Sequence, residues 1–469
     1  MEEKNVQLRE NKMGVMPVNK LLITMSLPMM VSMLVQALYN IVDSIFVAQI
    51  DENALTAVSL AFPLQTLMIA IGGGTGVGVN ALLSKALGER EFEKANKAAI
   101  NGVFLAVVSY IIFLAIGLFA VTPFYLSQTQ DVQIINYGTE YMTIVCCCSF
   151  GMYTQFIFER LLQSTGKTFY TMITQGTGAI INIILDPIFI FGYLGVPAMG
   201  VAGAAVATVI GQVVAGIMAV IINQKKNTEV HLRVKGFKPD ARIIKSIYVV
   251  GLPSIIMQSI GSVMTYGMNQ ILMAFTSTAA AVFGVYFKLQ SFIFMPIFGL
   301  NNGMVPIIAY NYGAGKRDRL LKTMKQSILY AVGIMIVGFF AFQVFPTQLF
   351  SLFEASETML AIGVPALRII SLHFLLAGFC IIIGSVFQAL GNGVYSMFVS
   401  MTRQLVVLLP AAWFLSKFGD VNLVWFAFPI AEIASLVMTV IFFMRINKSI
   451  ISKIGQESVK EKAETTFDD

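Results

Sequence analysis

The chain has 469 residues, of which 57% are hydrophobic and 12% charged, with a net charge of +6. Soluble domains carry about 25% charged residues, so this composition and the mean hydropathy of +0.78 exclude an ordinary soluble protein. The four cysteines lie in apolar runs without metal or redox spacing, and two histidines are too few for a histidine metal site. We therefore expect an all-α polytopic membrane protein without a cofactor.

Twelve runs of residues are long and apolar enough to cross a bilayer, which needs roughly 20 residues. They are expected near residues 20–49, 54–83, 98–123, 136–160, 170–192, 200–222, 244–273, 279–309, 320–345, 361–387, 394–416 and 422–444.

The polar breaks between these runs alternate in charge. One set is rich in Lys and Arg, with Lys85, Lys94, Lys167 and Lys316 among its members, and the other is acidic or uncharged. Lys and Arg accumulate on the cytoplasmic side of membrane proteins. The pattern predicts a multi-pass plasma-membrane protein with both termini in the cytoplasm, as an even number of spans requires.

The two halves of the chain repeat at a constant offset of 225 residues. Leu27-Pro28 corresponds to Leu252-Pro253, and Gln163 corresponds to Gln388. Each repeat holds six spans, so both enter the membrane from the same side. We predict two six-helix bundles in a V, related by a pseudo-two-fold axis along the membrane normal. The expected parts are an N-terminal lobe (1–223), a cytoplasmic linker (224–243), a C-terminal lobe (244–445) and a polar cytoplasmic tail (446–469).

Several motifs now resemble one family. The segments are Tyr39-Asn40-Ile41-Val42-Asp43, Gly74-x3-Gly78-x5-Ser84-x3-Gly88, Gln163-x2-Gly166, Asn182-x3-Asp186-Pro187 and Gly200-Val201-Ala202-Gly203. Together they resemble the multidrug and toxic compound extrusion (MATE) family, in its DinF and MepA-like branch. The resemblance implies a monomeric antiporter that exports amphiphilic, often cationic, organic compounds in exchange for H⁺ or Na⁺. Some branches place a carboxylate in the seventh or tenth span, whereas this chain has none in either.

Ionisable residues within a span are costly and indicate function. Asp43 and Asp186 lie at similar depth in the outer halves of the first and fifth spans, and Thr208 of the sixth span lies at a comparable level. Asn40 shares a helix face with Asp43, and Asn182 with Asp186. We predict that this group holds the coupling ion, H⁺ in preference to Na⁺, and no other metal. The alternative is a polar cluster that only locks helices together.

The expected central cavity lies between the lobes. Its predicted lining comes from Met33, Gln36 and Tyr39 of the first span, Gln65 and Met68 of the second, Gln258 of the seventh and Gln290 of the eighth. Prolines inside helices remove a backbone hydrogen bond and permit bending. Pro28, Pro187 and Pro253 are therefore the predicted conformational positions.

Two further charged pairs have different expected roles. Glu432 lies near the middle of the last span and Arg403 on the preceding one, and buried opposite charges usually pair. We predict a structural ion pair. Glu159 and Arg160, at the inner end of the fourth span, are expected at a solvated or interfacial position.

Other functions fit less well. An enzyme would need a cluster of catalytic groups, whereas the intramembrane charges are few and dispersed. The longest interior loop is too short for a nucleotide-binding domain, and nothing indicates nucleic-acid binding. The remaining alternative is a lipid or oligosaccharide flippase of related architecture. Flippases usually have a strongly basic cavity, and here Asp43 and Asp186 are the charges expected near the axis.

Overall fold

A computed structural model describes residues 10–232, 236–353 and 355–455. All regular structure in these ranges is helical, which confirms the predicted all-α class. The first half contains α1 (Lys12–Val15), α2 (Val18–Ala48), α3 (Glu52–Gly88), α4 (Phe92–Phe119), α5 (Val121–Leu126), α6 (Val132–Cys147), α7 (Phe150–Ser164), α8 (Thr168–Phe191), η1 (Tyr193–Gly195) and α9 (Val201–Lys226).

The second half repeats this order. It contains α10 (Ala241–Met273), α11 (Ser277–Gly313), α12 (Arg317–Val344), α13 (Pro346–Ser351), α14 (Glu357–Ile370), η2 (Ser371–His373), α15 (Phe374–Ala389), α16 (Gly393–Met401), the π-helix η3 (Thr402–Leu408), α17 (Leu409–Ser416), α18 (Val421–Val424), α19 (Ala427–Ser449) and η4 (Ile451–Lys453). The predicted tail and linker fall partly on residues 456–469 and 233–235, which lie outside the described ranges.

Eleven helices of the described chain are long and apolar enough to span a membrane, and a twelfth span forms if α6 and α7, bent by 45°, count as one. This agrees with the twelve predicted runs. Charged residues extend several helices beyond their apolar windows. For example, α4 begins at Phe92 rather than near residue 98, because Lys94 and Lys97 pair with glutamates of the same turn.

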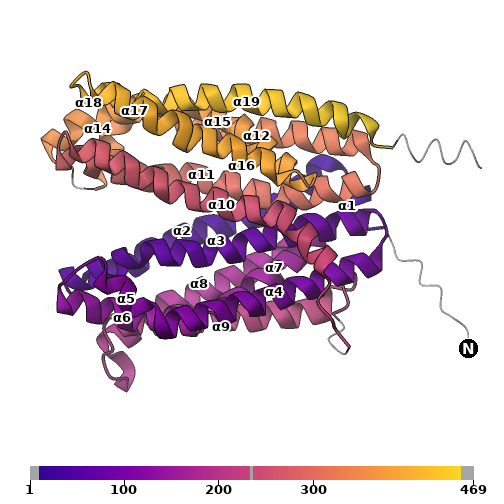
Figure 1. Cartoon of the computed structure of the whole chain (residues 1–469), viewed down its shortest axis with the longest axis horizontal. Helices are drawn as coiled ribbons and strands as arrows, with labels where there is room; N and C mark the ends of the chain where they lie inside the picture. The colour runs from indigo at the N-terminus through magenta and orange to yellow at the C-terminus, as the bar shows by residue number, and fades with distance from the viewer. Residues whose placement is uncertain (1–9, 233–235, 354, 456–469) are drawn as a thin grey trace, which may run out of the picture.

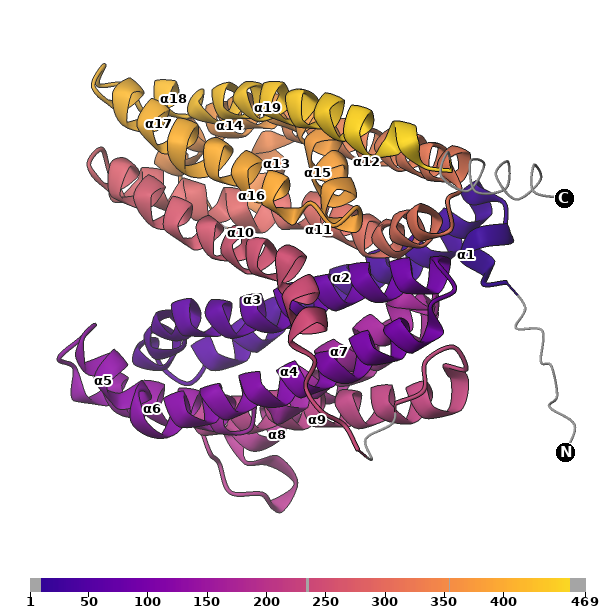
Figure 2. The same ribbon diagram turned by 45° about the vertical axis from the view of Figure 1, so that its right-hand side comes forward.

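The helices form two lobes, α2–α9 and α10–α19, as the repeat predicts (Figure 1). The lobes meet at the end of the molecule that carries α1, and their ribbons diverge toward the opposite end (Figure 2). We call the end near α1 the closed end. In this V shape, any central cavity lies between the lobes, on the side of their contact that faces away from α1.

Glycines allow the lobes to approach at the closed end. A Cβ added at Gly88 of α3 would overlap the carbonyl oxygen of Tyr310 of α11, and one at Gly313 would overlap the carbonyl oxygen of Lys85. These contacts are related by the 225-residue repeat. Gly78 of α3 likewise lies against the backbone of Ile247 in α10. The glycines are therefore close-packing positions between helices, as the sequence indicates.

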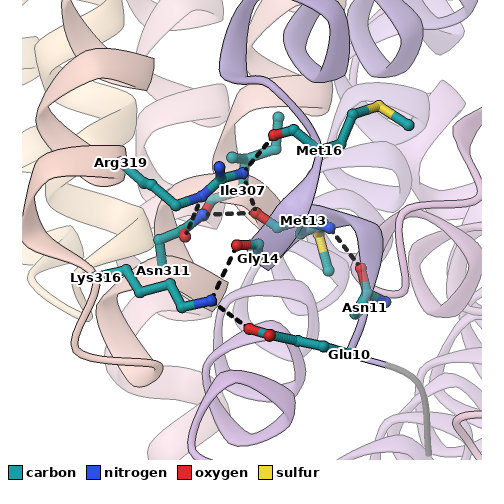
Figure 3. Close-up of polar contacts among 9 residues, drawn as sticks. All are labelled: Glu10, Asn11, Met13, Gly14, Met16, Ile307, Asn311, Lys316 and Arg319. Carbon is teal, nitrogen blue, oxygen red and sulfur yellow. Dashed lines mark hydrogen bonds and ion pairs between the residues drawn. The ribbon is translucent and has the colours of Figure 1, made fainter.

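The segment around α1 links the lobes at the same end. Arg319 of the C-terminal lobe donates to the carbonyl oxygens of Met13 and Met16, at 3.0 and 2.7 Å (Figure 3). On the other side, Asn11 donates to the carbonyl oxygen of Thr165 at 3.1 Å and to the carboxylate of Glu229. The described start of the chain therefore holds one lobe against the other.

The glycine contact gives a stability prediction. Gly78→Ala places a methyl group against the Ile247 backbone, which cannot move without separating the lobes. We expect a loss of about 1–3 kcal/mol, the usual cost of overpacking, seen as a lower melting temperature of the purified protein. The control is Gly333→Ala in α12, where an added Cβ meets nothing within 4 Å. Equal melting temperatures for the two variants would contradict the proposed role of Gly78.

Candidate functional site

A cavity of about 790 Å³ lies between the lobes. Its wall comes from α2, α3, α7, α8 and α9 of the first lobe and from α10, α11, α15, α16, η3 and α19 of the second. A volume of this size suits a drug-sized organic molecule. Both lobes contribute to the wall, so relative movement of the lobes changes the shape of the cavity.

The structure places all four predicted lining residues of the first and seventh spans in the wall. Met33, Gln36 and Tyr39 of α2 line the cavity, and so does Gln258 of α10.

Three predicted lining residues are not part of the wall. Gln65 donates to the hydroxyl of Tyr141 at 3.0 Å, and the sulfur of Met68 lies 3.8 Å from that of Cys146, so both side chains face α6. Gln290 is the counterpart of Gln65 in α11 and is likewise absent from the wall. The prediction for these three residues is wrong because the axial and outer faces of α3 and α11 are both apolar with scattered polar residues. The periodicity of apolar residues therefore does not show which face of α3 or α11 points toward the cavity.

The structure brings Asp43 and Asp186 together. Their carboxyl groups are in hydrogen-bonding contact, between α2 and α8. Asn182 donates to Asp186 Oδ1 at 3.3 Å and to the hydroxyl of Thr208 at 3.2 Å, so four of the five predicted coupling residues are joined. The fifth, Asn40, lines the cavity, as do Asn182 and Thr208. The two carboxyls lie behind the wall rather than in it.

This cluster is incompletely satisfied. Asp43 Oδ1, Asp186 Oδ2 and Asn182 Oδ1 are buried without a hydrogen-bond partner. Buried polar atoms in native proteins are nearly always paired, and exceptions need an explanation. Three unpaired oxygens on adjacent side chains are a suitable receptor for a proton or a small cation.

Two tyrosines complete the surroundings of the carboxyls. Tyr39 interacts electrostatically with the carboxyl groups of Asp43 and Asp186, and Tyr141 interacts with that of Asp43. Sequence analysis assigned Tyr39 to the cavity and did not identify Tyr141. No motif marks Tyr141, because it reaches the site only through the packing of α6 on α3.

The predicted conformational prolines all lie inside helices. Pro28 is in α2, Pro187 in α8 and Pro253 in α10. Pro187 directly follows Asp186. A change in the charge of that carboxyl therefore acts where the helix lacks a backbone hydrogen bond.

Arg403 and Glu432 form the predicted ion pair. Arg403 Nη1 lies 3.5 Å from Glu432 Oε2, and the Glu432 side chain is 2% exposed. Arg403 belongs to the π-helix η3 and lines the cavity, which sequence analysis did not foresee. π-Helical turns often occur at functional sites.

Glu159 and Arg160, expected at a solvated or interfacial position, both line the cavity. Glu159 is 2% exposed and accepts hydrogen bonds from Gln155, Thr174 and Gln175, at 3.0, 2.7 and 2.7 Å. The cavity wall therefore carries Glu159, Arg160 and Arg403, and not the two aspartates expected near the axis.

Comparison with known proteins tests the family resemblance. The MatE family model matches residues 28–188 and 253–414, one segment in each lobe and together more than half of the chain. The chain belongs to the MATE family. The multidrug export protein MepA of Staphylococcus haemolyticus (strain JCSC1435) is 28% identical to it over 438 residues, covering 92% of this chain and 95% of that protein. MepA of Staphylococcus aureus (strain MRSA252) is 25% identical, covering 92% and 94%.

Solved structures of MATE proteins agree with this MATE chain in fold. A multidrug resistance MATE family transporter in an outward-facing conformation has a TM-score of 0.89 and 26% identity, with 95% of this chain and 99% of that chain covered. A MATE structure described as being in the bent conformation has a TM-score of 0.85 and 26% identity, covering 94% and 97%. The chain is therefore a MATE transporter with the two-lobed fold, and not an enzyme.

The ion pair of this MATE transporter gives the second prediction. Glu432→Gln leaves Arg403 without a counter-ion, and breaking a buried pair costs about 3–5 kcal/mol. We expect lower yield and a lower melting temperature. Arg403→Gln added to Glu432→Gln should restore part of the loss. If Glu432→Gln keeps its yield and stability but loses gradient-driven export, the pair belongs to the coupling machinery instead.

Proposed function

We propose that this MATE protein is a cation-coupled antiporter that exports amphiphilic, often cationic, organic compounds, with H⁺ as the coupling ion. The observation that carries the proposal is the contact between Asp43 and Asp186, with unpaired buried oxygens beside a cavity of organic-molecule size. The staphylococcal relatives are named multidrug export proteins, which agrees with export of organic compounds.

The chemistry of two adjacent carboxyl groups supports proton binding. Two like charges in a water-poor site cannot both remain ionised cheaply. A proton shared between Asp43 and Asp186 relieves this repulsion. Loss of that proton leaves a negative charge on the pair of carboxyl groups. This pair lies behind Asn182 of the cavity wall, and its charge attracts a cationic substrate. Substrate and proton then compete for one conformational equilibrium, which is what antiport requires.

Alternating access requires the closed end to open. We infer that this end faces the cytoplasm, because the Lys- and Arg-rich segments between the predicted membrane spans lie there. The segment around α1 must then release one lobe in the inward-open state, through loss of its bonds with Arg319 or of the bonds from Asn11 to Thr165 and Glu229. Bending at Pro28, Pro187 and Pro253 is the proposed route. Relatives have been solved in conformations described as bent and straight.

Na⁺ is the alternative coupling ion. Asn182 and Thr208 supply oxygens beside the two carboxylates, and Na⁺ prefers oxygen ligands. A flippase function is less favoured. The wall holds two arginines, but Arg403 is neutralised by Glu432, and Glu159 adds a negative charge, so the cavity is not strongly basic.

Asp43→Asn tests the coupling mechanism because it mimics the protonated form. The variant should fold and reach the membrane, but gradient-driven export into proteoliposomes should fall to the level of empty vesicles. Substrate-induced proton release should disappear as well. Asp318→Asn, on the exposed first turn of α12, is the matched control and should export normally.

Correctly folded Asp43→Asn protein that still exports substrate against its gradient would refute this mechanism. Repeating the wild-type assay with an imposed Na⁺ gradient in place of the pH gradient decides between the two ions.

The orientation gives a further prediction. In a variant without native cysteines, Thr228→Cys and Asp318→Cys both place an exposed thiol at the closed end, whereas Ala198→Cys places one at the opposite end. A membrane-impermeant maleimide added to intact cells should label only Ala198→Cys. Labelling of the other two from outside would reverse the proposed topology.

A further inference from the structure

The helices α2 and α8 pack against each other and are joined by side chains at two levels. At the outer level, the carboxyl groups of Asp43 and Asp186 are in contact. At the inner level, nearer the closed end, the hydroxyl of Ser32 donates to the side-chain oxygen of Gln175. Ser32 precedes Asp43 by eleven residues, and Gln175 precedes Asp186 by eleven residues. The two levels are therefore in register, roughly 16 Å apart along the helices.

We call the bond between Ser32 and Gln175 the inner tie, and a carboxylate of a third helix fixes it. Gln175 Nε2 donates to Glu159 Oε2 of α7 at 2.7 Å. A glutamine amide carries both a donor NH₂ group and an acceptor oxygen, whereas an ionised carboxylate only accepts. Glu159 therefore takes the NH₂ group and leaves the amide oxygen of Gln175 for the hydroxyl of Ser32.

The remaining contacts of Glu159 hold its carboxylate in place. Gln155 and Thr174 donate to Oε1 at 3.0 and 2.7 Å. The neighbouring Arg160 is the charged group that interacts electrostatically with Glu159. The charge of Glu159 is thus compensated within the protein, and its side chain is placed to orient Gln175 rather than to bind a charged ligand.

The inner tie lies where α2 passes from one lobe to the other. Ser26 Oγ donates to the carbonyl oxygen of Leu300 in α11 of the second lobe, at 3.3 Å. Six residues later, Ser32 is bound to α8 of the first lobe. Pro28 lies between them, where α2 lacks a backbone hydrogen bond and can bend. The inner tie therefore anchors α2 to the first lobe directly beyond this proline.

The second lobe has no counterpart of the inner tie or of the carboxyl pair. At the repeat offset of 225 residues, the corresponding positions are Glu159 with Gly384, Ser32 with Met257 and Asp43 with Met268. Glycine has no side chain, and methionine has no hydrogen-bond donor. The inner tie and the carboxyl pair therefore occur together, in the first lobe.

We propose that Glu159 is a positioning residue for coupling, which holds α2 on α8 through Gln175 and makes the inner tie a pivot. This inference rests on the proposed function, in which protonation of Asp43 and Asp186 alters the contact between α2 and α8 at the outer level. With the inner tie in place, the segment between the two levels rotates about the tie and bends α2 at Pro28, beside its contact with α11. Without the tie, the outer change shifts α2 locally and does not reach the second lobe.

The experiment follows the lobes with spin labels at Thr228→Cys and Asp318→Cys, one at the closed end of each lobe, in a variant without native cysteines. Acidification should shift the distance distribution between the two labels, and Asp43→Asn should abolish this pH response. Glu159→Gln should abolish it as well, because a neutral amide no longer fixes the direction of Gln175. Gradient-driven export of a cationic rhodamine dye should fall about tenfold or more, since hydrogen bonding to a charged group is lost.

Exchange of the two side chains tests the positioning role directly. When Glu159→Gln is combined with Gln175→Glu, the carboxylate moves to α8, where it accepts from Ser32 and from the amide at position 159. This exchange variant should recover the pH response and most of the export. Ser32→Ala deletes only one hydroxyl but removes the inner tie from the side of α2, so it should lose the response. Glu140→Gln makes the same chemical change at an exposed position of α6 outside the cavity wall, and this matched control should respond as wild type does.

Three results would overturn the proposal. The first is a wild-type pH response in Glu159→Gln or in Ser32→Ala. The second is a folded exchange variant that does not recover the response. The third is a response that Asp43→Asn keeps and Glu159→Gln loses, because Glu159 would then be the titrating group itself.

Export of the dye separates this inference from the proposed function. If the lobes of wild-type protein respond to acid through the inner tie but no dye is exported under an imposed gradient, the positioning role stands and the export function fails. If Asp43→Asn loses export and Glu159→Gln exports as wild type does, the export function stands and the positioning role fails.

Discussion

Close approach of the two lobes at one end is the constraint on which the rest of the structure depends. Backbone meets backbone at Gly88 and Gly313, which contact the carbonyl oxygens of Tyr310 and Lys85 across the lobe boundary. Any larger residue would hold the helices apart. Close contacts continue along the helices to Gly74 against Gly251 and to Gly299 against Met30. Beyond these contacts the lobes diverge, and the diverging helices enclose the cavity.

This packing is compatible with the separation of the lobes that the proposed mechanism requires. In a membrane, helix association is driven by van der Waals packing and hydrogen bonds rather than by hydrophobic burial, since lipid is as apolar as the helix surface. The closed end combines glycine contacts with a small set of hydrogen bonds, from Arg319, Asn11 and Arg160. Such an interface can be stable in one state and still open when a few of its bonds are exchanged.

Much of the fold was predictable from sequence, because its signals are local or periodic. Apolar length located the spans, and the repeat at a fixed offset predicted two similar lobes. Asp43 and Asp186 were expected at one depth, and the structure brings them into contact. The helix faces were harder to predict. Met68 and Gln65 turn toward α6, and Arg160 turns into the cavity, because lobe packing decides these orientations and apolar helices carry little amphipathic signal.

The buried charges of this transporter divide into two groups by how completely they are satisfied. Glu159 has three donors, and Arg403 and Glu432 have each other. By contrast, Asp43 and Asp186 retain buried oxygens without partners. Burial of an incompletely satisfied polar group costs free energy that folding alone does not recover. A ligand that supplies the missing partner recovers that free energy only in the conformation that holds the site together. In the proposed mechanism, incomplete satisfaction gives the ion different affinities for different conformations, and such a difference is the requirement for coupling ion and substrate.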